Sequence, residues 1–385
     1  MNYSKILLSV LGLALIQSCS DDENIIEANP DNVTLQASYD ATRLKIIQIE
    51  PTLSGFENAT FTWKLGNEII GTEKVLGFVS DKAGAYDLTL EIKSIKSITT
   101  IKTAKTKINV QQETKTYSKY IAQVFDYLPS IGQFVNKLPV FTDGDKKSEM
   151  TIKAGKELIG KETGMVSLGG FGGYVVFGFD HTIINKADKR DFKVLGNGFA
   201  GSSEPGIIMV AYDKNKNGKP DDDEWYEIAG SEYKNPNTIK NYSITFQKPT
   251  IEDKIPNSEY IKWTDNQGNS GYKTKNSFHK QSYYPLWFEQ NELKFSGTLL
   301  PNNYTDQSGN GTYWVGKQYA YGYADNAPNN SEDSNIDIDW AVDKNGNPVK
   351  LMGIDFIKIY TATNQEAGWL GEISTEVTGA YDLHL

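Results

Sequence analysis

Short stretches of alternating apolar and polar residues dominate this sequence, and the period of an α-helix is almost absent. Such stretches include VTLQASY, FTWKL and YDLTLEIKS near the N-terminus, and PGIIMVAYD and IDFIKIYTA further along. Asn-Gly, Asp-Gly and Gly-Asn turns separate many of them. Alternation with a period of two places one face of a β-strand on a core, and these dipeptides reverse the chain between strands. The pattern therefore predicts an all-β protein.

The polar segment QQETKTYSKY (residues 111–120) divides the strands into two blocks, which we interpret as domains at residues 31–112 and 113–385. In the first block, Trp63 lies in the middle of a strand and Tyr86 follows a glycine at the start of another. A buried strand tryptophan and a corner tyrosine are typical of immunoglobulin-like sandwiches. This block resembles a PKD-like domain. The second block has many strands and no internal repeat, which predicts a larger jelly-roll-like β-sandwich.

The N-terminus has the features of an exported lipoprotein. A short basic start and the apolar run ILLSVLGLALI predict a signal peptide over residues 1–18, and Cys19, the only cysteine, follows directly. The stretch around Cys19 resembles a lipobox, which predicts lipidation of Cys19 and a tether over residues 19–30. The acidic run SDDEN (residues 20–24) resembles the export signal of surface lipoproteins, so we expect an outer-membrane protein that faces the cell exterior. A net charge of -10 disfavours binding to nucleic acid.

The run DKNKNGKPDDDE (residues 213–224) has the spacing of a calcium loop. Its ligands would be the side chains of Asp213, Asn215, Asn217, Asp221 and Glu224 together with the backbone carbonyl of Lys219. Apolar strand-like stretches flank the run, unlike the helices of an EF-hand. We therefore expect a structural Ca²⁺ site between two strands, and an Asn-Gly turn with acidic decoration is the alternative.

Two segments, residues 278–288 and 313–326, place aromatic residues among polar residues and glycines. In loops they would form a platform for a sugar ring or a flat cofactor, and in strands they would belong to the core. The candidate ligand-binding residues are Tyr283, Tyr284, Trp287, Tyr313, Trp314 and Tyr321. For Trp263, Trp287 and Trp314 we favour burial.

Other chemistry is less marked in the sequence. Paired carboxylates could serve a glycan-active enzyme, with Glu204, Asp265 and Glu372 as examples, although 49 acidic residues make a chance pair common. The acidic segment 325–339 is interpreted as a loop followed by a solvated strand face. The three histidines, His181, His279 and His384, are scattered, and we expect His181 at the surface. We predict no catalytic residues.

Several long stretches in residues 120–385, among them GGYVVFGFDHTIIN and KIYTATNQEAGWLGEISTEV, resemble a family of Bacteroidota cell-surface lipoproteins that carry an N-terminal PKD-like domain. The resemblance implies a TonB-dependent outer-membrane transporter as partner, including transporters for cobalamin. We therefore expect a non-enzymatic lipoprotein that captures a corrinoid or a glycan for such a transporter. A glycan-active enzyme and a structural adhesin are the alternatives.

Overall fold

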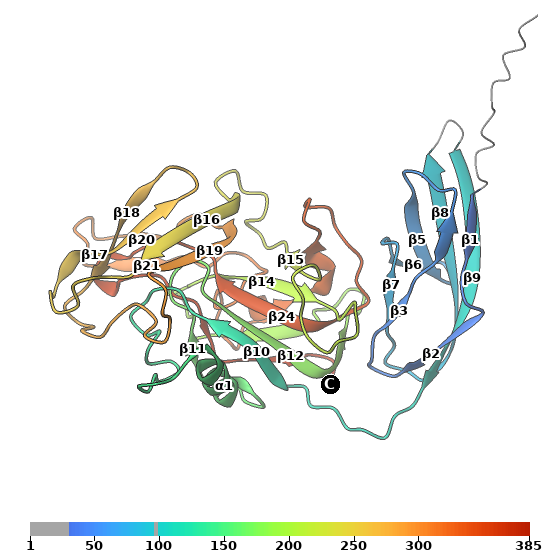
Figure 1. The fold of residues 1–385 in the computed structure, drawn as a ribbon, viewed down its shortest axis with the longest axis horizontal. Coiled ribbons are helices and arrows are strands. Elements are labelled where there is room, and N and C mark those ends of the chain that lie inside the picture. The colour runs from blue at the N-terminus through green and yellow to red at the C-terminus, as the bar shows by residue number, and fades with distance from the viewer. Residues whose placement is uncertain (1–30, 96–98) are drawn as a thin grey trace, which may run out of the picture.

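The protein is all-β, with an immunoglobulin/PKD-like sandwich followed by a larger jelly-roll-like β-sandwich (Figure 1). The computed structural model describes residues 31–95 and 99–385. The predicted signal peptide, the lipidation site Cys19 and the tether lie outside the described residues. No helix in the described ranges is long and apolar enough to cross a membrane.

The N-terminal sandwich packs a five-stranded sheet against two small strand pairs. The sheet has the order β2 (Ser38–Thr42), β9 (Thr99–Gln111), β8 (Gly84–Ile95), β5 (Thr60–Leu65), β6 (Glu68–Gly71). The pairs are β1 (Asn32–Thr34) with β4 (Thr52–Ser54), and β3 (Ile47–Ile49) with β7 (Leu76–Phe78). Only β2 and β9 run parallel among these paired strands.

Both immunoglobulin-like hallmarks predicted from the sequence are confirmed. Trp63 is fully buried in β5 and its indole N–H donates to the carbonyl of Glu73 at 3.0 Å. The hydroxyl of Tyr86, at the start of β8, donates to the carbonyl of Lys82 at 2.9 Å. This tyrosine therefore fastens the corner that leads into the strand.

The C-terminal sandwich has a central six-stranded sheet and smaller sheets over its faces (Figure 1). The central order is β10 (Gln123–Leu128), β12 (Tyr174–Ile184), β24 (Gly353–Thr361), β14 (Gly206–Ala211), β15 (Tyr226–Ile228), β23 (Ala341–Val342). A four-stranded sheet contains β18 (Ser270–Lys275), β17 (Asn257–Asp265), β16 (Ile239–Gln247), β19 (Glu292–Leu299), and a three-stranded sheet contains β22 (Asn335–Ile336), β13 (Phe192–Leu195), β26 (Gly379–Asp382). Two short pairs are β11 (Val166–Ser167) with β25 (Glu376–Val377), and β20 (Tyr304–Asp306) with β21 (Trp314–Gly316).

The central sheet is apolar on both faces because each face covers its own core. Ile357 and Ile359 of β24 point into a core shared with β13, β22 and β26. Tyr360 of the same strand points the other way, into a core shared with β16, β17 and β19. Successive side chains of a strand alternate between faces, so one strand supplies both cores. This explains why β14 and β24 read as nearly continuous apolar runs in the sequence.

The sequence reasoning found almost no helical period, and the structure corrects this at residues 147–158. Helix α1 (Lys147–Leu158) buries Met150, Ala154 and Leu158, which recur every four residues and face the core of the three-stranded sheet. The Glu149 carboxylate accepts from the backbone N–H of Lys146 and so satisfies one free donor at the N-terminus. Three further 3₁₀ turns lie at Glu332–Ser334, Ile338–Trp340 and Gly368–Leu370.

The segment around β3 of the N-terminal sandwich contacts β12 of the C-terminal one. The backbone N–H of Thr182 donates to the carbonyl of Leu44 at 2.9 Å, and the Thr182 hydroxyl accepts from the N–H of Ile46 at 3.1 Å. Lys45 donates to the carbonyl of Asp180. These bonds tie the two domains together directly, in addition to the chain segment that joins them.

Candidate functional site

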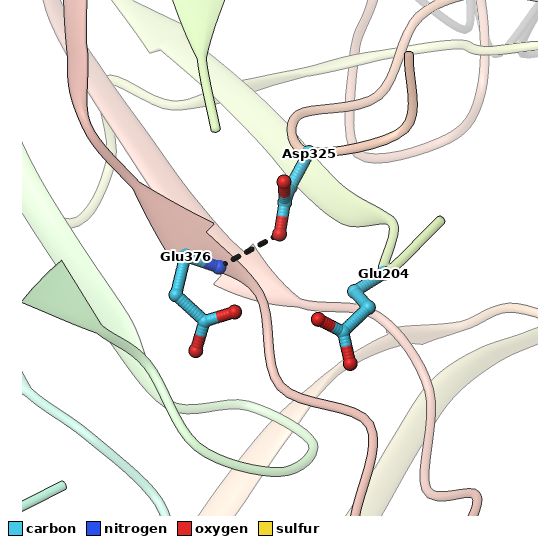
Figure 2. Close-up of side chains that lie close together, drawn as sticks. All are labelled: Glu204, Asp325 and Glu376. Atoms are coloured by element: carbon cyan, nitrogen blue, oxygen red, sulfur yellow. Dashed lines mark hydrogen bonds between the residues drawn. The ribbon is translucent and has the colours of Figure 1, made fainter. Parts of the chain in front are cut away.

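Three carboxylates from distant parts of the chain meet at one end of the central sheet. Glu204, Asp325 and Glu376 each have a carboxylate oxygen within 4.8 Å of the others. Among the described residues, no other three Asp, Glu, His or Cys side chains lie this close together. Figure 2 shows the side chains of Glu204 and Glu376 pointing toward each other, with Asp325 between them. Such crowding of like charges needs a structural cause.

Backbone pairing places the three residues. Glu204 lies two residues before β14, and its N–H donates to the carbonyl of Asp325 at 2.9 Å. Gly206 and Ala324 form an isolated antiparallel bridge directly beside this bond. Glu376 begins β25, and its own N–H donates to Asp325 Oδ2 at 2.9 Å (Figure 2). Main-chain bonds therefore fix the backbone from which each of the three side chains extends.

The carboxylate of Asp325 accepts hydrogen bonds from several backbone N–H groups. Its Oδ1 accepts from the backbone N–H groups of Asn197 and Gly198 at 2.8 and 2.7 Å. A Cβ on Gly196 would lie 2.2 Å from this oxygen, so the close approach requires glycine there. Three backbone donors in all converge on this one carboxylate, which favours its charged form.

Burial raises the pKa of every carboxyl group in the cluster. The pKa of Asp325 rises to about 7, and that of Glu376 rises to about 8 because burial is joined by repulsion from Asp325. Burial, followed by repulsion from Glu376, raises the pKa of Glu204 well above its usual range. Raised pKa values favour partial protonation of the group near neutral pH, and a protonated carboxyl group can both donate and accept hydrogen bonds.

A cavity of about 360 Å³ opens beside the cluster. Glu204, Glu376 and a fourth acid, Glu372, supply all of its charged lining, and no lysine or arginine lines it. Burial raises the pKa of Glu372 to about 7, and its Oε1 accepts from the N–H of Gln133 at 2.5 Å. The rest of the lining is polar or apolar and consists of Gln133, Phe134, Leu138, Met165, Asn197, Ser202, Tyr304, Leu370, Ile373 and Ser374.

The sequence reasoning named two of these acids and missed two. Glu204 and Glu372 were examples of candidate paired carboxylates, and the structure brings them to one cavity. Asp265, the third example, is instead the last residue of β17, where it accepts from the N–H groups of Gln267 and Asn269 in the turn that follows. Asp325, expected in a loop before a solvated face, is buried, and no candidate site in the sequence includes Glu376. Its one signal is its position as the single carboxylate in the otherwise uncharged segment 373–381.

The six candidate aromatic residues do not form one platform. Tyr283, Tyr284 and Trp287 are buried, which corrects the expectation that they form a binding surface. The Tyr283 and Tyr284 hydroxyls donate to the carbonyls of His279 and Gln290. The Trp287 ring stacks between Tyr127 and Phe141. Trp287 therefore belongs to the core, in agreement with the burial expected for it.

The remaining three candidates lie in two separate places. Trp314 is half-buried in β21, and its indole N–H donates to the carbonyl of Gly311. Tyr313 is exposed beside it. Tyr321 is exposed elsewhere, with its ring 4.7 Å from that of Trp340. Trp263 is partly buried against the core of the four-stranded sheet.

The predicted calcium loop connects β14 to β15, which pair with each other, so its expected place between two strands is confirmed. Asp213 accepts from the N–H groups of Asn217 and Gly218 at 3.1 and 2.7 Å. Gly218 has a φ of 74°, a conformation that favours glycine.

The other loop candidates form hydrogen bonds to the loop backbone and to one another. Glu224 is buried and accepts from the N–H groups of Lys214 and Asp221. The side-chain amides of Asn215 and Asn217 both donate to Asp221 Oδ2. Lys219 donates its N–H to Asn217 Oδ1, so side chains and backbone of the loop are joined by hydrogen bonds.

Two further expectations need correction. His181 is buried rather than at the surface, and its ring nitrogens contact Asp180 and Asp382 at 3.1 and 2.8 Å. In the acidic segment, Asp337 is also mostly buried and pairs with Arg190 at 2.6 Å. Both are polar groups whose burial depends on partners far away in the sequence.

Comparison with known proteins identifies the N-terminal domain. Residues 33–94 match the family model of the PKD-like domain. No curated protein matches the chain.

Some solved structures align weakly with the chain. A carbohydrate-binding module of the β-sandwich superfamily is 10% identical, with 93% of this chain and 98% of that chain covered and a TM-score of 0.18. A Bacteroides ovatus glucan-locus protein, SGBP-B, solved with a mixed-linkage heptasaccharide, is 11% identical over 69% and 70% of the chains, with a TM-score of 0.19. A Bacteroides thetaiotaomicron quinoprotein alcohol dehydrogenase-like protein is 12% identical over 63% of this chain, which spans only 47% of that protein, with a TM-score of 0.17. At these scores the alignments carry no argument about function.

Proposed function

We propose that this protein is a non-enzymatic surface lipoprotein that binds a neutral glycan in the carboxylate cavity and delivers it to a TonB-dependent outer-membrane transporter. The observation that carries the binding proposal is the lining of the cavity, whose charged groups are all carboxyl groups with raised pKa values. Such groups can both accept from and donate to sugar hydroxyls. Phe134 and Tyr304 add aromatic surface of the kind that packs against a sugar ring.

The size and charge of the cavity favour this ligand class over others. A volume of about 360 Å³ lies near the lower end of the range for small-molecule sites. An anionic ligand would meet no cationic side chain in the lining and would be repelled by the carboxyl groups as they ionise. A corrinoid, the ligand class implied by the family resemblance, is much larger than this cavity and would have to bind mainly outside it. Cobalamin therefore stands as the alternative ligand.

The test is direct binding with matched variants. We would screen the purified chain on an array of neutral glycans and titrate cyanocobalamin by calorimetry. The double variant Glu204→Gln/Glu376→Gln keeps the shapes of the side chains, and Glu289→Gln, an exposed glutamate, is the matched control. We expect array hits that the double variant loses by about tenfold or more and the control keeps. Heat from cyanocobalamin with no array hit would replace the glycan proposal by the corrinoid one.

Clustered carboxyl groups also favour a second candidate, a glycan-active enzyme. Glycosidases pair a protonated acid with an ionised carboxylate, and retaining enzymes place the two carboxyl groups about 5 Å apart. The close approach of Glu204, Asp325 and Glu376, with raised pKa values, is of this kind. Chromatography of array hits after prolonged incubation decides between the two functions. New reducing ends that Glu376→Gln abolishes would identify an enzyme, and intact glycan identifies a binding protein.

A structural Ca²⁺ ion completes the proposal. The loop between β14 and β15 offers the side chains of Asp213, Asn215, Asn217, Asp221 and Glu224, and the carbonyl of Lys219, as oxygen ligands, which Ca²⁺ prefers. The ion would brace the loop and take no part in ligand binding. Lipidation at Cys19 and a location on the outer face of the outer membrane belong to the same proposal.

A further inference from the structure

Three loops that surround the mouth of the carboxylate cavity carry aromatic side chains exposed to solvent. Phe278 is 68% exposed, Trp369 is 50% exposed and Phe134 is 36% exposed. Phe134 and Leu370 also line the cavity, and Trp369 directly precedes Leu370. The rings of Phe278 and Trp369 meet edge to face with centroids 6.1 Å apart. We call Phe134, Phe278 and Trp369 the aromatic rim.

Buried amides hold the rim in place. The side chain of Gln133 donates to the carbonyl of Leu370 at 2.7 Å and accepts from the Asn276 amide at 2.9 Å. Asn276 Oδ1 accepts from the N–H groups of Phe278 and His279 at 3.0 and 2.9 Å. One network therefore joins the three loops, so the rim rings are positioned before a ligand arrives.

Trp369 lies in a turn between two glycines, Gly368 and Gly371. Gly368 and Gly371 both have positive φ, at 56° and 93°. A Cβ on Gly371 would lie 2.1 Å from the side-chain nitrogen of Gln133, so the position of the Gln133 side chain depends on a glycine at residue 371. The Trp369 indole N–H donates to the carbonyl of Thr312, which orients the ring. A large apolar ring exposed on a rigid turn costs solubility and needs a reason.

We infer that the aromatic rim is a stacking subsite for the sugar rings that adjoin the one held in the carboxylate cavity, so that the ligand is a neutral oligosaccharide. This inference rests on the proposed function. Continuity with the cavity supports it, because Phe134 belongs to both and Leu370, which follows Trp369 in the chain, also lines the cavity. The two regions would also recognise different parts of a sugar. Carboxyl groups in the cavity would bond to the hydroxyls of one sugar ring, and the aromatic side chains of the rim would cover the C–H faces of the neighbouring sugar rings.

The experiment titrates glucose, cellobiose, cellohexaose, laminarihexaose and mannohexaose into the full chain by calorimetry. Variants are Trp369→Ala and Phe278→Ala, with Trp369→Phe as the conservative change. Tyr321→Ala, which removes an exposed ring that contacts Trp340 and is not part of the rim, is the matched control. We expect the affinity for one hexasaccharide to exceed that for its short fragments, and Trp369→Ala to reduce only the hexasaccharide affinity, by about tenfold or more.

A second measurement uses the unaltered rim. The hexasaccharide should protect Trp369 from acrylamide quenching, seen as the difference between the unaltered chain and Trp369→Phe. If Trp369→Ala keeps the full gain with chain length and no protection is seen, the rim inference is wrong. The proposed function then still stands, provided that Glu204→Gln/Glu376→Gln loses binding. If no sugar in the series and no glycan on the array binds, both proposals fail.

Discussion

The replacement Glu376→Gln tests whether the cavity stores electrostatic strain. Glu376 is buried, and burial with repulsion from Asp325 raises its pKa from 4.5 to about 8. The folded protein therefore holds this proton between about pH 4.5 and pH 8, where the unfolded chain has lost it. Because the folded state binds more protons, stability falls as pH rises through this window, and the full cost is present above pH 8.

The structure sets the magnitude. Each pH unit between the two pKa values is worth about 1.4 kcal/mol, so the ceiling for Glu376 is about 5 kcal/mol. Asp325 and Glu204 share the same repulsion, so we expect Glu376→Gln to recover about 2 to 5 kcal/mol of unfolding free energy at pH 9. The amide oxygen can still accept from the Ser374 hydroxyl, which now bonds Glu376 Oε1 at 2.8 Å. At pH 4.5 the variant and the unaltered chain should be about equally stable.

The assay is urea unfolding at pH 4.5, 7 and 9, followed by tryptophan fluorescence. Six of the seven tryptophans lie in residues 113–385, so the signal reports the C-terminal sandwich. Glu289→Gln, which alters an exposed glutamate, controls for a general change in charge. Equal stabilities of Glu376→Gln and the unaltered chain at pH 9 would refute the reasoning, since Glu376 would then ionise without cost.

Three further outcomes are expected. Chelation should lower the melting temperature, and Asp213→Ala with Glu224→Ala should remove that response; a melting curve indifferent to chelator would exclude the calcium proposal. Tyr86→Phe should lower the stability of the N-terminal domain by about 1 kcal/mol through loss of the bond to the Lys82 carbonyl, measured by calorimetry of the full chain, and an unchanged transition would contradict this. Cys19→Ala or globomycin should abolish palmitate labelling, whereas persistent labelling would remove the lipid-anchor prediction.

Features that depend on neighbouring residues were predictable from the sequence. Alternating stretches fixed the all-β class, and the positions of Trp63 and Tyr86 indicated the immunoglobulin-like sandwich, because side-chain alternation and corner geometry are local. The calcium-type loop was placed between strands for the same reason, from twelve consecutive residues and their apolar flanks. Helix α1 was missed although Met150, Ala154 and Leu158 recur every four residues, because a single short helix gives a weak signal among strands.

The carboxylate cavity was decided by tertiary structure. Glu204 and Asp325 are separated by 121 positions, and they become neighbours through their own backbone hydrogen bond and the bridge between Gly206 and Ala324 beside it. Burial then does what no local pattern can reveal, since the pKa of a carboxyl group depends on what excludes water from it. In the sequence, Glu204 and Glu372 are two of 49 acidic residues, and no local pattern indicates that they lie close together.

For the aromatic residues, too, the tertiary structure decided which side chains are exposed. The sequence located the segment that contains Tyr283, Tyr284 and Trp287, but whether a ring is core or surface depends on which sheet covers it, and here the rings are buried. Phe278 and Trp369 stay exposed because a network through Gln133 and Asn276 holds their loops at the cavity mouth. Sequence by itself determined the strands, the domain type and the local loops. The packing of those strands decided which charges meet and which rings remain in contact with water.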